Sequence, residues 1–170
     1  DKAFLYYSPV QIVAIDPASG PVAGGVPVMV TGSGFAGKAT LIIGDRIAID
    51  TQSMDDSTLL AVTPPGEPGW ANVSVSSDEG LATLIGAFFY YEYPEILEIS
   101  PAAGSASGGG VVHIKMKGAH EEAEVFFNDM PAASVSFVDY GLLEVVTPPG
   151  QVGFVNLTVT TPYGSNTRPN

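Results

Sequence analysis

The sequence predicts an all-β protein built from two tandem β-sandwiches, and three observations lead to this prediction. One pattern of residues occurs twice, with an offset of 84 residues between the copies. Apolar and polar side chains alternate with a period of two along several segments, which is typical of strands with one buried face. Gly- and Pro-rich turn sequences recur about every 8 to 12 residues, as expected for the short strands of a sandwich.

The repeat is clearest in the segment Val-Thr-Pro-Pro-Gly, which occurs at residues 62–66 and again at residues 146–150. The same offset places Pro17 on Pro101 and extends with no net gap over nearly the whole chain. A match of this length at one spacing identifies an internal repeat.

The ends of the repeat indicate where the domains begin. Residues 4–7 (FLYY) match residues 88–91 (FFYY) at the same offset, and the later segment closes the first complete repeat. We therefore expect residues 1–9 to be the last strand of a preceding repeat. The first complete domain is expected over residues 10–93. The second, over residues 94–170, is expected to lack its final strand.

The strands can be placed in chain order from the alternation. Residues 40–44 (TLIIG) are almost continuously apolar, which predicts a strand near the centre of the first sandwich. Residues 71–77 (ANVSVSS) alternate, with Ala, Val and Val on the buried face. In the second repeat residues 111–117 (VVHIKMK) and 155–160 (VNLTVT) alternate, and residues 124–128 (EVFFN) are again more apolar. No capped segment with a period of 3.6 occurs, so no helix is predicted.

The two Pro-Pro-Gly segments are predicted to be structural turns. Pro64 restricts the residue before it to extended backbone, and Pro65 presets the first central position of a tight turn. Gly66 is then expected to take the positive φ of the second position of a type II turn. The segment would end one strand and redirect the chain into the next. The same roles are expected of Pro148, Pro149 and Gly150.

Taken together, these motifs resemble the IPT/TIG domain, an immunoglobulin-like, E-set-like β-sandwich of plexins, transcription factors and many surface proteins. In the first repeat the resemblance rests on Ile12, Ile15, Pro17, Gly20, Gly24, Gly25, Val28, Val30, Gly32, Gly34, Phe35, residues 63–66 and residues 88–90. In the second repeat it rests on Ile96, Ile99, Pro101, Gly104, Gly108, Gly109, Val112, Ile114, Gly118 and residues 147–150. The second repeat departs from the pattern because it lacks the Gly-x-Gly-Phe loop of the first.

The resemblance implies a non-catalytic protein. It implies tandem repeats of a longer extracellular or cell-surface array, which provide spacing and contact other proteins, neighbouring repeats of the same chain or glycans. Two alternatives remain open: accessory domains of a carbohydrate-active enzyme, and a Rel-type DNA-binding domain. The net charge of −12, with 6 lysine and arginine residues, argues against nucleic acid. No apolar run is long enough to cross a bilayer, so no direct membrane insertion of this segment is expected.

The residue inventory also argues against an enzyme. The chain has no cysteine and 2 histidines, and no serine lies in the context of a catalytic nucleophile with a convergent base and acid. Residues 32–38 (GSGFAGK) approach a phosphate-binding loop, but they are not followed by the Ser or Thr that would bind Mg²⁺ or by a helix. Residues 120–124 (HEEAE) lack the second histidine of a zinc-protease helix. Both segments are therefore expected to be loops between strands.

Two pairs of equivalent residues are candidate sites. Asn72 and Asn156 begin Asn-Val-Ser and Asn-Leu-Thr, which are acceptor sequences for N-glycosylation in a eukaryotic secreted protein and plain polar strand positions in a bacterial one. Trp70 and Phe154 follow the Pro-Pro-Gly segments and are out of phase with the buried side chains. They are candidate contact or interdomain aromatics. They either face a ligand or, in the interpretation that we favour, pack across the end of their own core or against the neighbouring repeat.

Calcium at the interdomain junction is the one cofactor that the sequence raises. Asp78, Glu79, Glu92, Glu95 and Glu98 lie near the junction in the sequence, and their oxygen atoms would suit Ca²⁺. Calcium takes about six or more converging ligands, however, and no compact acidic motif specifies such a set. A solvated acidic surface is the alternative, and no other cofactor is expected.

Overall fold

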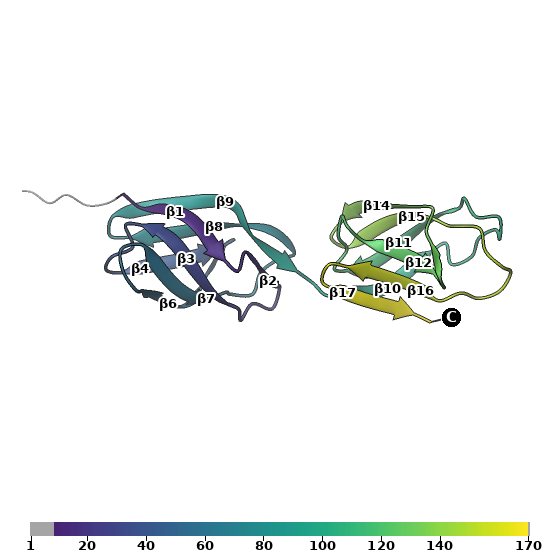
Figure 1. The fold of residues 1–170 in the computed structure, drawn as a ribbon, viewed down its shortest axis with the longest axis horizontal. Coiled ribbons are helices and arrows are strands. Elements are labelled where there is room, and N and C mark those ends of the chain that lie inside the picture. Colours follow the sequence, from purple (N-terminus) through teal and green to yellow (C-terminus); the bar gives the residue numbers. More distant parts are fainter. Residues whose placement is uncertain (1–8, 170) are drawn as a thin grey trace, which may run out of the picture. The chain divides into compact units, whose positions relative to one another are not determined.

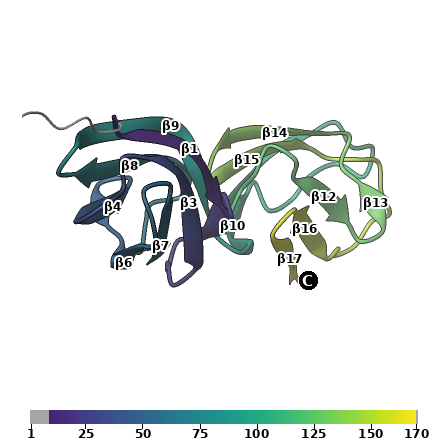
Figure 2. The same cartoon turned by 60° about the vertical axis from the view of Figure 1, so that its left-hand side comes forward.

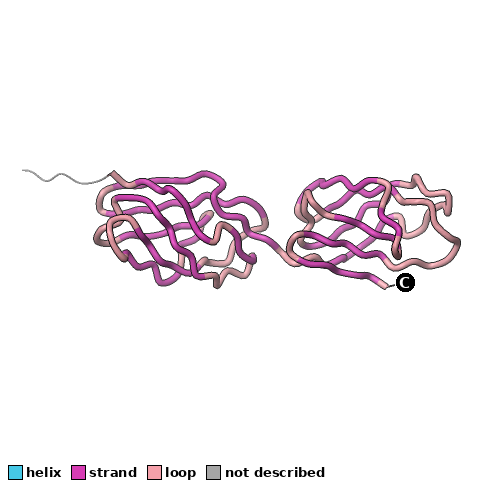
Figure 3. The backbone as a smooth tube through the Cα atoms, in the orientation of Figure 1, coloured by secondary structure: helices cyan, strands magenta, loops and turns pink. Residues whose placement is uncertain are grey.

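The computed structural model describes residues 9–169, and this part of the chain consists of strands and their connections. No helix occurs within it (Figure 3), which confirms the all-β prediction. The predicted strand of a preceding repeat, at residues 4–7, lies outside the described residues. The described residues form two compact units that divide after Tyr91.

The first unit packs two sheets around one core (Figures 1 and 2). One sheet has the strand order β1-β3-β7-β6, and the other has the order β2-β9-β8-β4-β5. Every pair is antiparallel except β2 with β9, which is parallel. The strands are β1 (Gln11–Asp16), β2 (Ser19–Pro21), β3 (Pro27–Ser33), β4 (Ala39–Ile43), β5 (Arg46–Ile47), β6 (Ile49–Ser53), β7 (Thr58–Val62), β8 (Gly69–Ser77) and β9 (Gly80–Tyr91).

The second unit repeats this topology with fewer strands. Its sheets have the orders β10-β11-β15-β14 and β13-β12-β16-β17, and all pairs are antiparallel. The strands are β10 (Glu95–Ser100), β11 (Val111–Lys117), β12 (Glu124–Phe127), β13 (Met130–Pro131), β14 (Ser134–Asp139), β15 (Leu142–Val146), β16 (Leu157–Thr161) and β17 (Gly164–Arg168).

Each core lies between the two sheets of its unit and uses the residues that the alternation predicts. In the first unit Val30 and Leu59 of one sheet face Val73 and Val75 of the other, and all four are fully buried. Burying one such side chain contributes about 1.5–3 kcal/mol to folding. The equivalent residues of the second unit, which are also buried, are Ile114, Leu143, Leu157 and Val159.

The repeat extends to an irregularity of the backbone. The pairing of β1 with β3 shifts register between Ile12 and Ala14, and the pairing of β10 with β11 shifts between Ile96 and Glu98. The two register shifts lie at equivalent positions, because they are separated by the 84-residue offset of the repeat. A bulge bends its strand and increases the local twist, so both edge strands curve over their cores at the same place.

The units differ at one side of the second sheet. In the first unit the end of β9 lies between two strands: Phe89 pairs with Ser19 of β2 and with Trp70 of β8. In the second unit the segments equivalent to β2 and to the start of β8, at residues 103–105 and 153–155, are not strands. No described strand lies between them.

The Pro-Pro-Gly segment connects β7 in one sheet to β8 in the other, and its conformation differs from the predicted turn. Neither Gly66 nor Gly150 has a positive φ, so the prediction of a type II turn is wrong. The reason lies in a tertiary hydrogen bond that both corners make, since the Gly150 N–H donates to the Ala106 carbonyl at 2.9 Å as the Gly66 N–H does to the equivalent carbonyl. A Cβ at Gly66 would overlap the ring of Tyr90, and the Gly66 N–H donates to the Val22 carbonyl at 2.8 Å. Gly66 is therefore required by the space beneath the ring and not by its backbone angles.

A second close approach fixes the other side of this corner. Gly24 has φ +70°, and a Cβ there would overlap the carbonyl group of Pro64. The next residue, Gly25, donates its N–H to the Thr63 carbonyl at 2.9 Å. The loop between β2 and β3 thus packs backbone against backbone on the Pro-Pro-Gly segment, which only glycine permits at position 24.

This geometry predicts opposite outcomes for two equivalent substitutions. Gly66→Ala should lower the free energy of unfolding of the first unit by about 1–3 kcal/mol, because the new methyl group overlaps a buried ring. Gly150→Ala is the matched control, since its Cβ would meet no atom within 4 Å, and it should be neutral or stabilising by up to about 1 kcal/mol. Urea unfolding of both variants measures the difference. Equal losses in the two variants would show that the ring contact does not constrain the corner.

Candidate functional site

The outer face of β8 brings the candidate residues of the first repeat together. Successive side chains of a strand alternate between faces, so Val73 and Val75 enter the core while Trp70, Asn72 and Ser74 share the opposite face. This placement is the one that the alternation predicts. The outer face of β8 is therefore the candidate contact surface of this unit.

Trp70 lies at the beginning of this face and remains largely in solvent. It pairs in register with Phe89 of β9, and the two rings meet edge-on with centroids 5.1 Å apart. Even so, Trp70 is 66% exposed. It does not belong to the core cluster of its own unit, so the first of the two packings that we favour from the sequence, across the end of its own core, does not occur. The indole instead presents an apolar surface beside polar side chains.

Asn72 has a structural partner across the sheet. Its Oδ1 accepts a hydrogen bond of 2.9 Å from the N–H of Gly86, where the pairing of β8 with β9 shifts register. Gly86 has φ +55°, and its N–H points at the side chain of Asn72. The carboxamide thus satisfies a donor that the irregular pairing leaves without a ladder partner. This role could not be predicted from the sequence, because it depends on a register shift.

The equivalent residues of the second unit lie in a more open segment. Phe154 is 91% exposed and precedes the start of β16, so it too does not pack across its own core. Asn156 is also exposed. Its N–H donates to Oδ1 of Asn128 at 2.8 Å, which holds this asparagine against the turn between β12 and β13.

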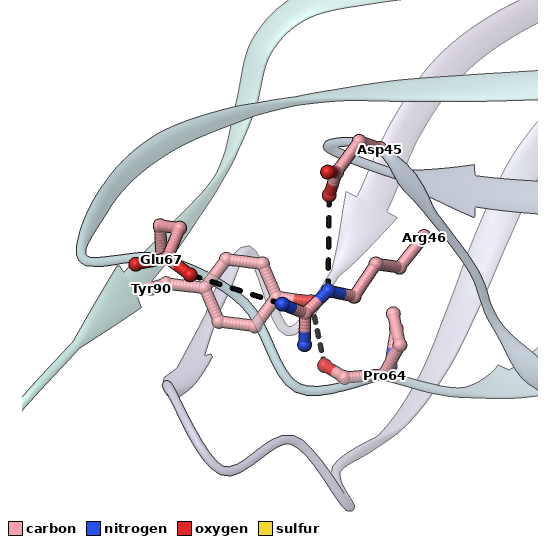
Figure 4. Close-up of polar contacts among 5 residues, drawn as sticks. All are labelled: Asp45, Arg46, Pro64, Glu67 and Tyr90. Carbon is pink, nitrogen blue, oxygen red and sulfur yellow. Dashed lines mark hydrogen bonds and ion pairs between the residues drawn. The ribbon is translucent and has the colours of Figure 1, made fainter.

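Tyr90 closes the core of the first unit beneath the Pro-Pro-Gly corner (Figure 4). Its hydroxyl donates a hydrogen bond of 2.8 Å to the Pro64 carbonyl. Burial raises the pKa of Tyr90 to about 12, and the nearby Arg46 guanidinium opposes the shift. Arg46 itself lies 3.8 Å from carboxylate oxygens of Asp45 and of Glu67 (Figure 4).

The Tyr90 ring has no counterpart among the described residues of the second unit. A Cβ placed on Gly104 or Gly150 would meet no atom within 4 Å, whereas one on Gly20 would contact Phe88 and one on Gly66 would overlap Tyr90. Val152, near Phe154, is almost completely exposed. This side of the second unit is therefore apolar and uncovered by the described residues. We call it the open side, defined by Gly104, residues 150–155 and the sheet edge that they adjoin.

Ionisable side chains are scattered over the described surface. Within residues 9–169, no three histidine or carboxylate side chains gather where they could hold a metal ion. Of the acidic residues considered for calcium, Glu95 is paired with Lys117 at 2.7 Å. The segment that approaches a phosphate-binding loop runs from β3 directly into β4, and residues 120–124 lead into β12. Both are the loops that the sequence predicts. The described part also holds no helix long and apolar enough to cross a membrane.

Tyr90 predicts a loss of stability at alkaline pH. Its pKa is raised to about 12 in the folded chain by burial, whereas an unfolded tyrosine titrates near 10. The unfolded state therefore loses its proton first, so this contribution to stability is fully present below about pH 10 and is lost as the pH rises toward 12. Urea unfolding measures the free energy of unfolding from about pH 9 to about pH 11, and this free energy should fall less in Tyr90→Phe than in the parent chain. An equal fall in both chains would contradict the raised pKa of Tyr90.

The open side of the second unit predicts that this unit accepts an added strand. A peptide with the sequence of residues 85–92 (IGAFFYYE) carries the aromatic part of β9. Added to the 170-residue chain, it should raise the melting temperature of the second unit. A control peptide with Ala in place of Phe88 and Tyr90, the two side chains buried in the first core, should have little effect. Calorimetric titration measures the binding of each peptide, and thermal unfolding measures its effect on the melting temperature. Equal effects of the two peptides would argue against a strand-binding site on the open side.

Known proteins with related sequences include two long ones. Fibrocystin-L from Homo sapiens is 28% identical over 154 residues, and fibrocystin-L from Mus musculus is 32% identical over 130 residues. These alignments cover 88% and 72% of this chain. The chain spans only 4% of the human relative and 3% of the mouse relative.

One solved structure has a similar fold at low sequence identity, and a second is less similar in structure. The surface glycan-binding protein PbSGBP-B from Prevotella bryantii is 14% identical and has a TM-score of 0.51. The superposition covers 96% of this chain and 42% of the PbSGBP-B chain. The extracellular region of plexin A4 is 17% identical and has a TM-score of 0.47. That superposition covers 89% of this chain and 14% of the plexin chain.

A protein-family model matches both units. The model that describes the IPT/TIG domain matches residues 9–91 and, separately, residues 94–169. The two matches span nearly the whole described chain and fall on the two sandwiches in turn. Both sandwiches are therefore immunoglobulin-like modules of this type, and the chain belongs to the IPT/TIG domain family.

Proposed function

We propose that this chain is a non-catalytic structural and adhesive segment of a longer extracellular or cell-surface protein. Its tandem units would provide spacing and present surfaces for contact. The observation that carries the proposal is that one sandwich occurs twice, each time with its own buried core. Units with separate cores can be added to an array without redesign of their neighbours, as in other repeat proteins. The scattered ionisable groups fit this role better than they fit catalysis.

The outer face of β8 is the surface on which we place the contact. Trp70 is exposed there, and Leu81 and Ile85 of the neighbouring β9 are exposed as well. Apolar side chains gathered among polar ones, such as the hydrogen-bonded pair Ser74 and Thr83, are typical of surfaces that bind other molecules. The partners that this chemistry suits are other proteins, neighbouring repeats or glycans.

A second candidate is an accessory domain of a carbohydrate-active enzyme. The exposed indole of Trp70 favours it, because a flat aromatic ring suits the apolar face of a sugar. A catalytic domain elsewhere in the same polypeptide would be required. The Rel-type alternative is disfavoured by electrostatics, since a net charge of −12 repels a polyanion and supplies few cations for phosphate contacts.

The spacing role predicts two separate unfolding events under force. Single-molecule pulling on the 170-residue chain should show two steps, each releasing about 25 nm of polypeptide, the extended length of one repeat less its folded length. Because the cores are separate, Gly66→Ala should weaken one step and leave the other unchanged. A single cooperative step, or extension without resistance, would contradict independent units.

A further inference from the structure

An exposed aromatic side chain precedes the acceptor asparagine by two residues in both units. The two segments are Trp-Ala-Asn-Val-Ser at residues 70–74 and Phe-Val-Asn-Leu-Thr at residues 154–158. Both aromatic side chains are mostly exposed, and neither belongs to the core cluster of its unit. The two features that the sequence raises as separate candidates thus form one repeated pair.

The geometry of β8 places the members of the pair side by side. Side chains two residues apart share a face, and their Cα atoms are about 6.6 Å apart in a strand. The hydrogen bond from Gly86 to Asn72 uses Oδ1, whereas N-glycans are attached at Nδ2. That bond orients the carboxamide, and the edge-on contact with Phe89 supports the Trp70 ring. The attachment atom and the neighbouring aromatic surface are therefore both held on the outer face.

The chemistry of the first sugar complements this arrangement. One face of a pyranose ring presents mainly C–H groups, and the face of an aromatic ring carries partial negative charge that attracts them. Stacking the sugar on the indole also removes apolar surface from water. Because the sugar is tethered at Asn72, its association with Trp70 is intramolecular and loses little entropy.

We propose that Asn72 is N-glycosylated and that Trp70 packs against the first N-acetylglucosamine, with Asn156 and Phe154 in the same roles in the second unit. Attachment forms a bond between Nδ2 and C1 of the sugar and breaks the bond from C1 to the diphosphate of a lipid-linked oligosaccharide donor. The lipid diphosphate leaves, and Nδ2 releases one proton. This inference rests on the extracellular location in the proposed function and assigns a covalent ligand to the outer face of β8.

The test compares glycosylated and unglycosylated forms of the same chain. The 170-residue chain is secreted from cultured animal cells behind a cleavable signal, and bacterial expression supplies the reference without glycan. Glycopeptide mass spectrometry should find both asparagines occupied, and the secreted form should melt about 4 °C higher, the shift that one modest contact gives a domain of this size. In Trp70→Ala the part of this difference that belongs to the first unit should disappear, and in Trp70→Phe it should persist.

Leu81→Ala is the matched control, since Leu81 is a similarly exposed apolar residue on the same outer face, opposite Ser76. It should keep the full glycan-dependent difference. The acetyl methyl protons of the first sugar give a readout that does not depend on stability, because the indole ring should shift their NMR resonance upfield in the parent chain.

Several results would overturn the proposal. They are an unoccupied Asn72 in the secreted chain, an acetyl methyl resonance at its free-sugar position in the parent, or an undiminished glycan-dependent shift in Trp70→Ala. Should Trp70→Ala not fold, the resonance in the parent and in Trp70→Phe decides alone. The pulling experiment on the bacterial chain contains no glycan, so failure of the spacing role would be recognised separately.

Discussion

In the first unit the buried hydroxyl of Tyr90 donates to the carbonyl of Pro64, and this hydrogen bond fastens the last strand to the corner between the two sheets. Three glycines pack closely around this corner and the last strand. Gly66 lies beneath the Tyr90 ring, Gly24 lies against the Pro64 carbonyl, and Gly20 contacts the ring of Phe88. Close packing of this kind tolerates no added methyl group without displacement of its neighbours. β9, the strand that carries Tyr90, also pairs in parallel with β2.

The sequence was sufficient to predict most of the fold. The 84-residue repeat predicted two like units, and the alternation in residues 71–77 and 111–117 predicted which side chains are buried. Both signals are local or periodic, so a single sequence carries them. The conformation at Gly66 was predicted wrongly, because turn preferences treat the segment as isolated. The tertiary contact that both corners share is a hydrogen bond from the glycine N–H to a carbonyl 44 residues earlier in the chain, that of Val22 for Gly66 and that of Ala106 for Gly150.

The candidate site was predictable only in part, for a similar reason. The outward direction of Trp70 and Asn72 follows from the period of the strand, and the structure agrees. The exposure of Trp70 and of Phe154 could not be read from the pattern, because it depends on what lies over them. The partner of Asn72 could not be predicted either, since Gly86 reaches it through a register shift that no propensity encodes. Long-range register and surface coverage are properties of the assembled sheet.

The two polar atoms of the Asn72 carboxamide have separate roles. Oδ1 completes the irregular pairing with Gly86, and Nδ2 is the acceptor of the proposed glycan. Most substitutions of Asn72 would therefore remove the sugar and also the acceptor for the Gly86 N–H, whereas aspartate would remove only the sugar. The hydroxyl residue of the acceptor sequence, Ser74, contacts Thr83 on the outer surface and is the less constrained position. Lineages that lose the modification should do so through position 74, or through aspartate at position 72, while keeping an oxygen acceptor at position 72, so the two traits leave separable marks on the sequence record.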